Sequence, residues 1–372
     1  MICITVYSDG NSGVAQELRQ YFINRSTEVL FIEHPLIPKG GQSSVIQAYD
    51  SSGKIILERT VPVSGNILLR HIQCALITFF SVLRYRNKIR TIFCSSNIDI
   101  IVSSLCSSKP KIYISIDFVP RRFSFFLYEC IFRILDRIAY KLSKEIWHSY
   151  PDAAQFKPWA PQKKCITTFH GNHFSKRNHF NGASRNVHRL VYYGGVNASV
   201  HLDKAINAVK ILSQSWQDTE LLIIGKAWDP EYEKVLYQHA VKSVIEKKII
   251  WHGQISNPAD AYAILVTCGV ALCIYETNPS MPSWYQLPGK IYAYAACGLP
   301  VLVLDTSGPI TVKTVTQNKL GIVTSLEGIV SCLQNLFENQ ARYADLSTST
   351  LAWASEYDWE KKFDLHCRRI GL

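Results

Sequence analysis

Residues 285–303 read Tyr-Gln-Leu-Pro-Gly-Lys-Ile-Tyr-Ala-Tyr-Ala-Ala-Cys-Gly-Leu-Pro-Val-Leu-Val, and this stretch decides how the second half of the chain folds. Pro288 and Gly289 open a helix whose apolar residues recur at helical spacing, and Gly298 ends it before an apolar strand. Lys290 stands in the first turn of that helix, where the helix dipole disfavours a cation. A bound anion would supply the missing counter-charge, whereas the alternative is an exposed lysine whose ammonium lies in water.

On both sides of this segment, short apolar runs alternate with helical stretches, which predicts parallel α/β layering. In the second half we expect strands at residues 190–193, 221–224, 249–252, 269–273 and 301–304, and helices at residues 202–213 and 290–297. Three of these strands end in glycine, at Gly194-Gly195, Gly225 and Gly253, which is typical of the ligand-binding edge of a doubly wound sheet. The Gly194-Gly195 pair would let backbone amides approach a phosphate, although glycine pairs are also common in tight turns.

The first half of the chain shows the same alternation with one interruption. We expect strands at residues 2–7, 29–32, 100–103, 111–116 and 145–148. Residues 42–61 alternate between apolar and polar types around a turn at residues 50–53, which predicts a β-hairpin inserted into this domain. The polar stretch 172–188 is typical of a linker, so we expect domains at residues 1–180 and 181–355.

Composition narrows the class of protein. The chain has 372 residues, of which 47% are hydrophobic and 19% charged, which excludes a disordered or coiled-coil protein. No uninterrupted apolar run reaches the length of a membrane span, because the best candidate, residues 67–83, contains Arg70, His71 and Gln73.

The N-terminus has no basic leader, so we expect no signal peptide. The eleven cysteines show no paired spacing, and we expect buried thiols of a reducing cytoplasm rather than zinc ligands.

The net charge of +11 belongs entirely to the first half of the chain. Residues 1–180 hold 23 Lys and Arg against 12 Asp and Glu, whereas residues 181–372 hold 17 of each sign. This split and the lack of a binding motif argue against a nucleic-acid partner and favour an anionic surface or acceptor met by one domain. Residues 121–137 mix aromatic and arginine side chains, and the basic cluster 84–90 follows the apolar segment 67–83. Each element could dock on an anionic bilayer or pack as an amphipathic helix on the sheet.

The pattern Pro288-x-Lys-Ile-x-x-Tyr-x-Ala-x-Gly-Leu-Pro-Val resembles the nucleotide-sugar domain of GT-B glycosyltransferases, chiefly the family 4 type of bacterial polysaccharide synthesis. Further similarities lie at residues 190–195, 222–226, 251–253 and 357–360, and in the first half at residues 8–13 and 114–120. The resemblance implies a GT-B fold of two Rossmann-like, doubly wound domains facing a central cleft. It also implies a terminal helix at residues 356–372 that crosses back to the first domain.

The resemblance places a nucleotide-sugar site in the second domain. The candidates for binding the donor diphosphate are Gly194, Gly195, Lys226 and Lys290, and those for the nucleotide and sugar are Gly253, Tyr275, Glu276, Tyr285 and Gln286. Family 4 enzymes typically carry two glutamates at the positions of Tyr285 and Ala293. Neither residue is acidic here, so other residues must contact the nucleotide ribose and the donor sugar, with Glu276 and Gln286 as candidates. Because no Asp-x-Asp pair is present, we expect no metal or other cofactor, and lysines and glycine amides would neutralise the leaving diphosphate.

The acceptor side is predicted in the first domain. Asp117 ends a predicted strand, and its carboxylate could accept the proton of the acceptor hydroxyl as a general base; the alternative is a loop aspartate bonded to nearby amides. The remaining acceptor-side candidates are Gly10, Asn11, Arg121 and Arg122.

Together these inferences predict transfer of a sugar from a nucleotide sugar to a glycan acceptor, lipid-linked for example through a polyprenyl diphosphate. The pathway would be bacterial surface polysaccharide synthesis (O-antigen, capsule or exopolysaccharide), with the enzyme in the cytoplasm, peripheral on the inner face of the cytoplasmic membrane. Two alternatives stay open: a nucleotide-sugar epimerase of GT-B fold, and a catalytically silent GT-B subunit that binds a partner.

Overall fold

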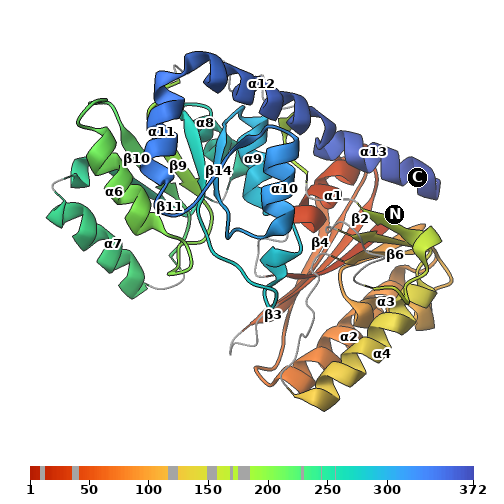
Figure 1. Cartoon of the computed structure of the whole chain (residues 1–372). Coiled ribbons are helices and arrows are strands. Elements are labelled where there is room, and N and C mark those ends of the chain that lie inside the picture. The colour runs from red at the N-terminus through yellow and green to blue at the C-terminus, as the bar shows by residue number, and fades with distance from the viewer. Residues whose placement is uncertain are drawn as a thin grey trace. The chain divides into compact units, whose positions relative to one another are not determined.

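The computed structural model shows a chain of two compact units. Unit 1 comprises Met1–Phe169 and Lys362–Leu372, and unit 2 comprises His170–Lys361. The structure describes residues 1–8, 13–35, 42–115, 125–148, 157–167, 171–174, 185–227, 230–243, 245–255 and 257–372. Each unit has a largely parallel sheet with helices packed on it (Figure 1), so the predicted α/β fold with two parallel-sheet domains is confirmed.

The described sheet of unit 1 has the strand order β4-β3-β2-β1-β5-β6-β7-β8. Its strands are β1 (Ile2–Ser8), β2 (Val29–Pro35), β3 (Ser43–Tyr49), β4 (Ile55–Pro62), β5 (Thr91–Cys94), β6 (Lys111–Ser115), β7 (Glu145–His148) and β8 (Cys165–Thr167). β3 and β4 form the predicted antiparallel hairpin, and β3 also pairs antiparallel with β2. The other neighbours pair parallel, and β1 and β5 are almost completely buried at the centre.

The predicted strand at residues 100–103 is wrong, because these residues lie inside helix α3 (Asn97–Cys106). Ser96 begins that helix by accepting a hydrogen bond from the amide of Ile98 at 3.2 Å, which makes it an N-cap. Burial then recurs at Ile100, Ser103 and Cys106, three residues apart, as one face of a helix requires. The strand in this part of the chain is β5, which ends three residues before α3 begins.

Helices α2 (Ile67–Tyr85), α3 and α4 (Phe126–Leu142) form a layer on unit 1, with α3 packed against both neighbours. Unit 1 also contains α1 (Gly13–Ile23), the short turn η1 (Gln162–Lys164) and most of α13 (Trp359–Ile370). In α13, the Asp364 carboxylate accepts from the Tyr21 hydroxyl at 2.8 Å and from Arg25 at 2.7 Å. These bonds tie the last residues of the chain to α1.

By length and composition, α2 is the one helix of the described chain that is long and apolar enough to cross a membrane. Its apolar window has a mean hydropathy of 1.4, and 22% of that window is buried. The helix contains the segment in which Arg70, His71 and Gln73 interrupt the apolar run.

Unit 2 contains a described sheet in the order β11-β10-β9-β12-β13-β14, with every neighbouring pair parallel. Its strands are β9 (Arg189–Tyr193), β10 (Glu220–Ile224), β11 (Ile249–Gly253), β12 (Val270–Cys273), β13 (Val301–Leu304) and β14 (Gly321–Thr324). Its helices and short turns are α6 (Leu202–Leu212), α7 (Pro230–Lys242), η3 (Glu246–Lys248), α8 (Pro258–Leu265), η4 (Pro282–Trp284), α9 (Gly289–Ala296), α10 (Pro309–Gln317), α11 (Ile329–Glu338) and α12 (Gln340–Glu356). Every strand and helix that the sequence predicts in this half overlaps an observed one.

Helix α9 lies at the core of unit 2, because its residues 291–296 are all buried. It packs against α12, where the Tyr292 and Trp353 rings lie 5.1 Å apart. The Tyr294 hydroxyl accepts from the amide of Tyr193 at 2.7 Å and donates to the carbonyl of Leu272 at 3.2 Å. These bonds fix α9 against the ends of β9 and β12, and with it the orientation of Lys290.

Candidate functional site

Each sheet has a switch point, where the strand order changes direction. In unit 2 the strand β9 lies between β10 and β12, and in unit 1 the strand β1 lies between β2 and β5. Ligands of open parallel sheets bind outside the carboxyl ends of the strands at such a point. The residues that follow β9 and β12, and those that follow β1 and β5, are therefore the places to look for a site.

The glycine turns of unit 2 meet at the switch point. The amide of Gly194 donates to the carbonyl of Ile224 at 2.9 Å, and the amide of Gly225 donates to the carbonyl of Gly253 at 2.8 Å. Gly225 has a φ of +154°, and a Cβ at this position would lie 1.8 Å from the carbonyl oxygen of Gly194. Only glycine allows this approach of two backbones. The structure thus brings the turns of three strands to one edge of the sheet.

Lys290 reaches the same edge from the first turn of α9. Its ammonium donates to the Tyr192 hydroxyl at 3.0 Å and lies 4.2 Å from the centroid of the Tyr192 ring. A Cβ on Gly194 would lie 3.0 Å from Lys290 Nζ, so the ammonium rests against the glycine turn. Among the described residues no carboxylate forms an ion pair with Lys290. Its positive charge is therefore available to a bound anion.

Tyr192 is a site residue that the sequence analysis did not single out. Its hydroxyl accepts from Lys290 and donates to the carbonyl of Gly195 at 2.6 Å, so it links the cation to the glycine turn. The side chain is almost completely buried, and in the sequence it looks like any aromatic residue of a core strand. No sequence signal distinguishes it, because its role depends on a contact with a residue 98 positions away.

The end of β12 supplies two further predicted residues. Tyr275 is buried, and its hydroxyl donates to the carbonyl of Ser307 at 3.1 Å, while its ring lies 5.9 Å from Lys290 Nζ. Burial raises the pKa of this hydroxyl well above its usual range, so it stays neutral. The exposed Glu276 places its Oε1 3.4 Å from Nε2 of His201, which precedes α6. A carboxylate and an imidazole therefore stand at the switch point, and His201 was not predicted.

The remaining predicted residues of unit 2 differ in their placement. Lys226 follows β10 at the same edge, with an exposed side chain and a carbonyl that accepts from the amide of Val196 at 3.0 Å. Tyr285 donates from its hydroxyl to the carbonyl of Pro279 at 2.8 Å, within its own loop, and Gln286 lies half-buried before α9.

The acceptor-side predictions Asp117, Gly10, Asn11, Arg121 and Arg122 lie outside the described residues. Within the described chain, no three His, Cys, Asp or Glu side chains are placed to share a metal ion.

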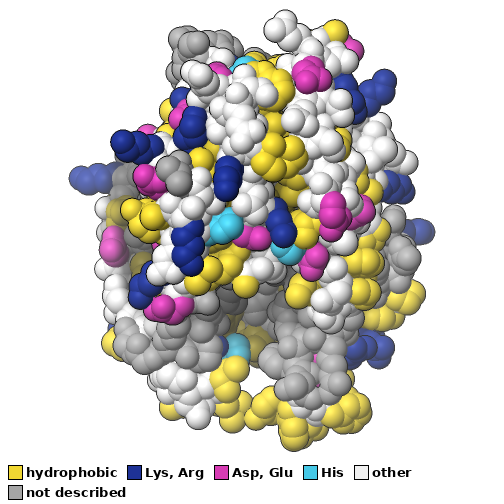
Figure 2. Space-filling view, turned by 60° about the vertical axis from the view of Figure 1, so that its left-hand side comes forward, with side chains coloured by type: hydrophobic (Ala, Val, Ile, Leu, Met, Phe, Trp, Pro, Cys, Tyr) yellow, Lys and Arg dark blue, Asp and Glu magenta, His cyan; other side chains and the backbone are white. Residues whose placement is uncertain are grey.

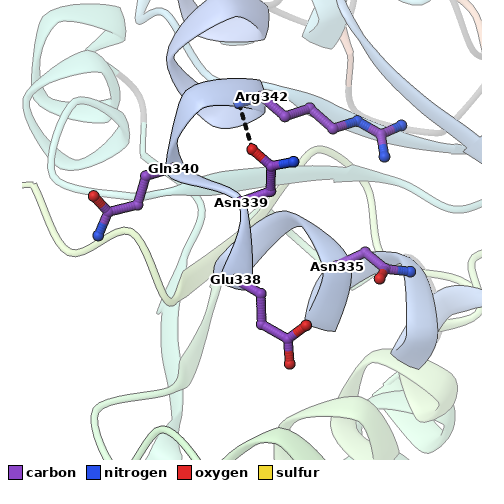
Figure 3. Close-up of a pocket in the computed structure, with 5 residues that line it drawn as sticks. All are labelled: Asn335, Glu338, Asn339, Gln340 and Arg342. Atoms are coloured by element: carbon purple, nitrogen blue, oxygen red, sulfur yellow. Dashed lines mark hydrogen bonds between the residues drawn. The ribbon is translucent and has the colours of Figure 1, made fainter.

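A cavity of about 570 Å³ lies where α11 meets α12 (Figure 3), lined by Asn335, Glu338, Asn339, Gln340 and Arg342. The Asn339 side chain accepts from the amide of Arg342 at 2.9 Å and so caps α12. None of these residues belongs to a strand-end turn, so this cavity is separate from the switch point.

Comparison with known proteins shows which family and which solved structures this chain resembles. Residues 187–339, all in unit 2, match the family described as Glycosyl transferases group 1. A search of curated proteins finds no match. Among solved structures, HepE (Alr3699) of Anabaena in complex with UDP is 12% identical with a TM-score of 0.67, covering 99% of each chain.

Two further structures have the same fold. WaaG, described as a glycosyltransferase involved in lipopolysaccharide biosynthesis, is 13% identical with a TM-score of 0.65 and covers 100% of both chains. A glycosyltransferase of Rickettsia africae is 12% identical with a TM-score of 0.69, covering 99% of this chain and 96% of its own. The fold is therefore that of the GT-B glycosyltransferases. Within that fold class, the family match covers residues 187–339 of unit 2, which resemble the glycosyl transferases of group 1.

Proposed function

We propose that this glycosyltransferase moves a sugar from a nucleotide-sugar donor bound by unit 2 to a lipid-linked glycan acceptor bound by unit 1, in bacterial surface polysaccharide synthesis. The observation that carries the donor half is Lys290, which has no carboxylate partner in the described part of the chain and rests on the Gly194 turn at the switch point. HepE, which shares the fold, has been crystallised with UDP and with UDP-glucose, and WaaG acts in lipopolysaccharide synthesis.

In this proposal unit 2 stabilises the leaving nucleoside diphosphate. Negative charge grows on the diphosphate as the bond to the sugar breaks. The Lys290 ammonium, the amides of the glycine turns and the amino end of α9 all present positive charge to that position. Tyr192 holds the ammonium in place, so little reorganisation is needed when the charge develops. We extend the proposal to a reaction without a metal ion, with these donors supplying the positive charge.

A thermal-stability screen against nucleoside diphosphates tests the donor site. We expect one of them to raise the Tm, and Lys290→Met to weaken its binding by about 10- to 150-fold, the equivalent of losing a charge-assisted hydrogen bond of roughly 1.5–3 kcal/mol. Lys242→Met removes an exposed lysine at the end of α7 and should leave the affinity unchanged. Equal binding by both variants in calorimetry would refute the assignment of Lys290.

The same purified protein separates glycosyl transfer from its alternatives. Release of nucleoside diphosphate only when an acceptor is present supports transfer. Conversion of the donor sugar without an acceptor supports an epimerase, and no donor turnover under any condition supports a silent subunit.

The acceptor half of the proposal rests on the unusual burial of α2. The inward face of this helix carries Arg70, Cys74, Thr78 and Val82, three of which are polar or weakly polar. Its exposed face carries large apolar side chains that are 42–62% accessible: Ile67, Leu68, Leu69, Ile72, Leu76 and Phe80. A helix of a water-soluble domain normally shows the opposite arrangement. The outer face of α2 is therefore suited to an apolar environment.

Helix α4 repeats this arrangement. Its buried positions include Glu129 and Asp136, and the Asp136 carboxylate accepts from the Tyr113 hydroxyl at 3.0 Å and from Lys157 at 2.7 Å. Its exposed face carries apolar side chains that are 38–74% accessible: Phe126, Leu127, Ile131, Ile134, Ile138 and Leu142. Figure 2 shows hydrophobic side chains exposed along the lower edge of the view. We call these exposed side chains of α2 and α4 the apolar face.

Basic side chains accompany the apolar face. The exposed ones at or after the carboxyl end of α2 are Arg84, Arg86, Lys88 and Arg90, and those on and after α4 are Arg133, Arg137, Lys141 and Lys144. Exposed apolar residues bordered by lysine and arginine are typical of a surface that lies on an anionic bilayer. We therefore propose that unit 1 docks on the cytoplasmic face of the membrane, where a lipid-linked acceptor would be met.

A further inference from the structure

Helix α2 contains a buried cation that neither the donor site nor the apolar face explains. Arg70 is 2% exposed, and its Nε and Nη1 are buried without a hydrogen-bond partner in the described structure. Nor does it form an ion pair with any described carboxylate. A guanidinium withdrawn from water is unfavourable unless an anion or an acceptor group pairs with it. An anion from outside the chain would satisfy it.

Arg70 lies near the switch point of unit 1. The ring of His71, the residue next to Arg70, lies 6.1 Å from the Tyr7 ring. Burial raises the pKa of the Tyr7 hydroxyl, and the positive charge of Arg70 opposes that rise. Tyr7 is the penultimate residue of β1, and its amide donates to the hydroxyl of Ser95, just after β5, at 3.2 Å. Asn97, the first residue of α3, has a buried Nδ2 that also lacks a partner among the described atoms. Two unsatisfied donor groups thus stand at the edge where an open parallel sheet binds its ligand.

A chain of buried hydrogen bonds holds α2 at this edge. His34 places Nδ1 2.8 Å from the Ser44 hydroxyl and Nε2 2.9 Å from the Thr78 hydroxyl, and Thr78 donates to the Asp99 carboxylate at 3.0 Å. Because Thr78 donates to Asp99, Nε2 of His34 must carry the proton that Thr78 accepts, and burial keeps this ring neutral by lowering its pKa to about 3. Asp99 forms no ion pair with Arg70, so this network orients the helix without neutralising the guanidinium.

We propose that Arg70 binds an oxyanion of the acceptor, a phosphate or carboxylate group, at the switch point of unit 1. This inference rests on the proposed function, since it names the chemistry of the acceptor that unit 1 would bind. A guanidinium suits this role because its planar N–H groups match two oxygens of a phosphate or carboxylate. Asn97 would add a neutral donor to the same group. The phosphate could belong to a lipid-linked diphosphate or to a phosphorylated sugar, and the carboxylate to an acidic sugar.

The test is thermal unfolding of the full chain with simple anions at constant ionic strength: inorganic phosphate, inorganic pyrophosphate and glucuronate, each against chloride. We expect one of them to raise the Tm by about 2–4 °C at concentrations near ten times its Kd. Arg70→Met should lose this rise. Arg19→Met is the matched control, because it removes a guanidinium of the same unit that already bonds to Gln47 and Tyr49. Lys290→Met should keep the part of the Tm rise that depends on Arg70. Anion binding in unit 1 can therefore be distinguished from anion binding in unit 2.

The outcomes are distinct. A larger effect of phosphate or pyrophosphate identifies a phosphate-bearing acceptor, and a larger effect of glucuronate identifies an acidic sugar. An equal rise in Arg70→Met and Arg19→Met, or no rise in the parent protein, overturns the proposal. If Arg70→Met does not fold, Arg70→Lys keeps the charge but loses the planar fork, and an unchanged rise in that variant also counts against the proposal. Nucleotide binding measured on the same samples reports separately on the proposed function.

Discussion

The switch points of the two units present positive charge in different ways. In unit 2 the cation is the half-buried Lys290, which bonds to a phenol at 3.0 Å and rests on backbone made accessible by glycine. In unit 1 the cation is the buried Arg70, whose Nε and Nη1 have no partner among the described atoms, on a helix that a network of side chains positions through Thr78. Lys290 begins the helix that follows β12, whereas Arg70 lies on the helix that precedes β5, and each of these strands is a neighbour of the first strand of its sheet.

This difference has a consequence for recognition. Backbone amides and an ammonium place few directional demands on a phosphate, so a site of this kind can accept many phosphate-bearing ligands. A buried guanidinium presents its N–H groups as a planar fork, so it accepts an anion in a narrower range of geometries. The proposed donor site of unit 2 would therefore suit a group common to many nucleotide sugars, and the proposed anion site of unit 1 would suit a particular acceptor group.

In unit 2, we expect the largest loss of stability from a substitution at Gly225, where two glycine turns approach each other closely. A methyl group in Gly225→Ala would overlap the Gly194 carbonyl, at a φ that side chains rarely adopt, so we expect a loss of at least about 3 kcal/mol in stability. Chemical denaturation followed by tryptophan fluorescence measures this. Gly289→Ala is the control, because its Cβ would meet nothing within 4 Å. Similar losses in the two variants would contradict the close approach of the two turns.

The buried side-chain network of unit 1 can be tested at Asp99. Burial raises the pKa of this carboxyl group to about 7. Between pH 4 and 7 the folded state keeps a proton that the unfolded state has lost, so the stability of the native protein falls as the pH rises through this range. Asp99→Asn keeps an acceptor for Thr78 and removes this dependence. Its stability relative to the parent should rise by about 3–4 kcal/mol from pH 4 to pH 7.5.

Denaturation of Asp99→Asn and its parent at several pH values tests this prediction. Glu58→Gln, a change at an exposed carboxylate of β4, should show no comparable trend. A pH-independent difference between Asp99→Asn and its parent would mean that Asp99 is not held as a neutral acid.

The apolar face distinguishes the surfaces of the two units and can be tested with vesicles. We expect the protein to bind vesicles of phosphatidylglycerol and phosphatidylcholine at low salt and to dissociate as salt approaches physiological levels, because screening sets in beyond about 8 Å. The double variant Leu68→Ser/Phe80→Ser should weaken binding by about 2 kcal/mol. Ile211→Ser, at an exposed apolar site of unit 2, should not. A protein that ignores these vesicles at low salt would refute the membrane proposal.

The smallest expected effect concerns Tyr192. Tyr192→Phe keeps the ring beneath Lys290 but removes the hydroxyl that joins Lys290 to Gly195. We expect nucleoside diphosphate affinity to fall by about 3- to 10-fold, which corresponds to one hydrogen bond of roughly 1 kcal/mol. Tyr237→Phe, at an exposed position of α7, is the control in the same calorimetric titration. Equal affinities would show that Lys290 does not need the hydroxyl to stay in position.

The sequence by itself determined the elements whose signals are local. Glycines at strand ends, the hairpin around residues 50–53 and the helix that begins at Gly289 could all be predicted, because turn geometry and helix ends depend on a few neighbouring residues. The prediction failed at residues 100–103, where an apolar run too short to show a period was compatible with either a strand or a helix.

Only the tertiary structure decided which way each amphipathic face turns and which distant side chains meet. Periodicity shows that α2 has an apolar and a polar stripe, but the usual assumption that the apolar stripe faces the core is reversed here. The buried position of Arg70 follows from that reversal. Tyr192 likewise gains its role from Lys290 on a separate element. Such contacts join residues far apart in the chain, so no local pattern encodes them, and they arise only when the packed sheet and helices bring those residues together.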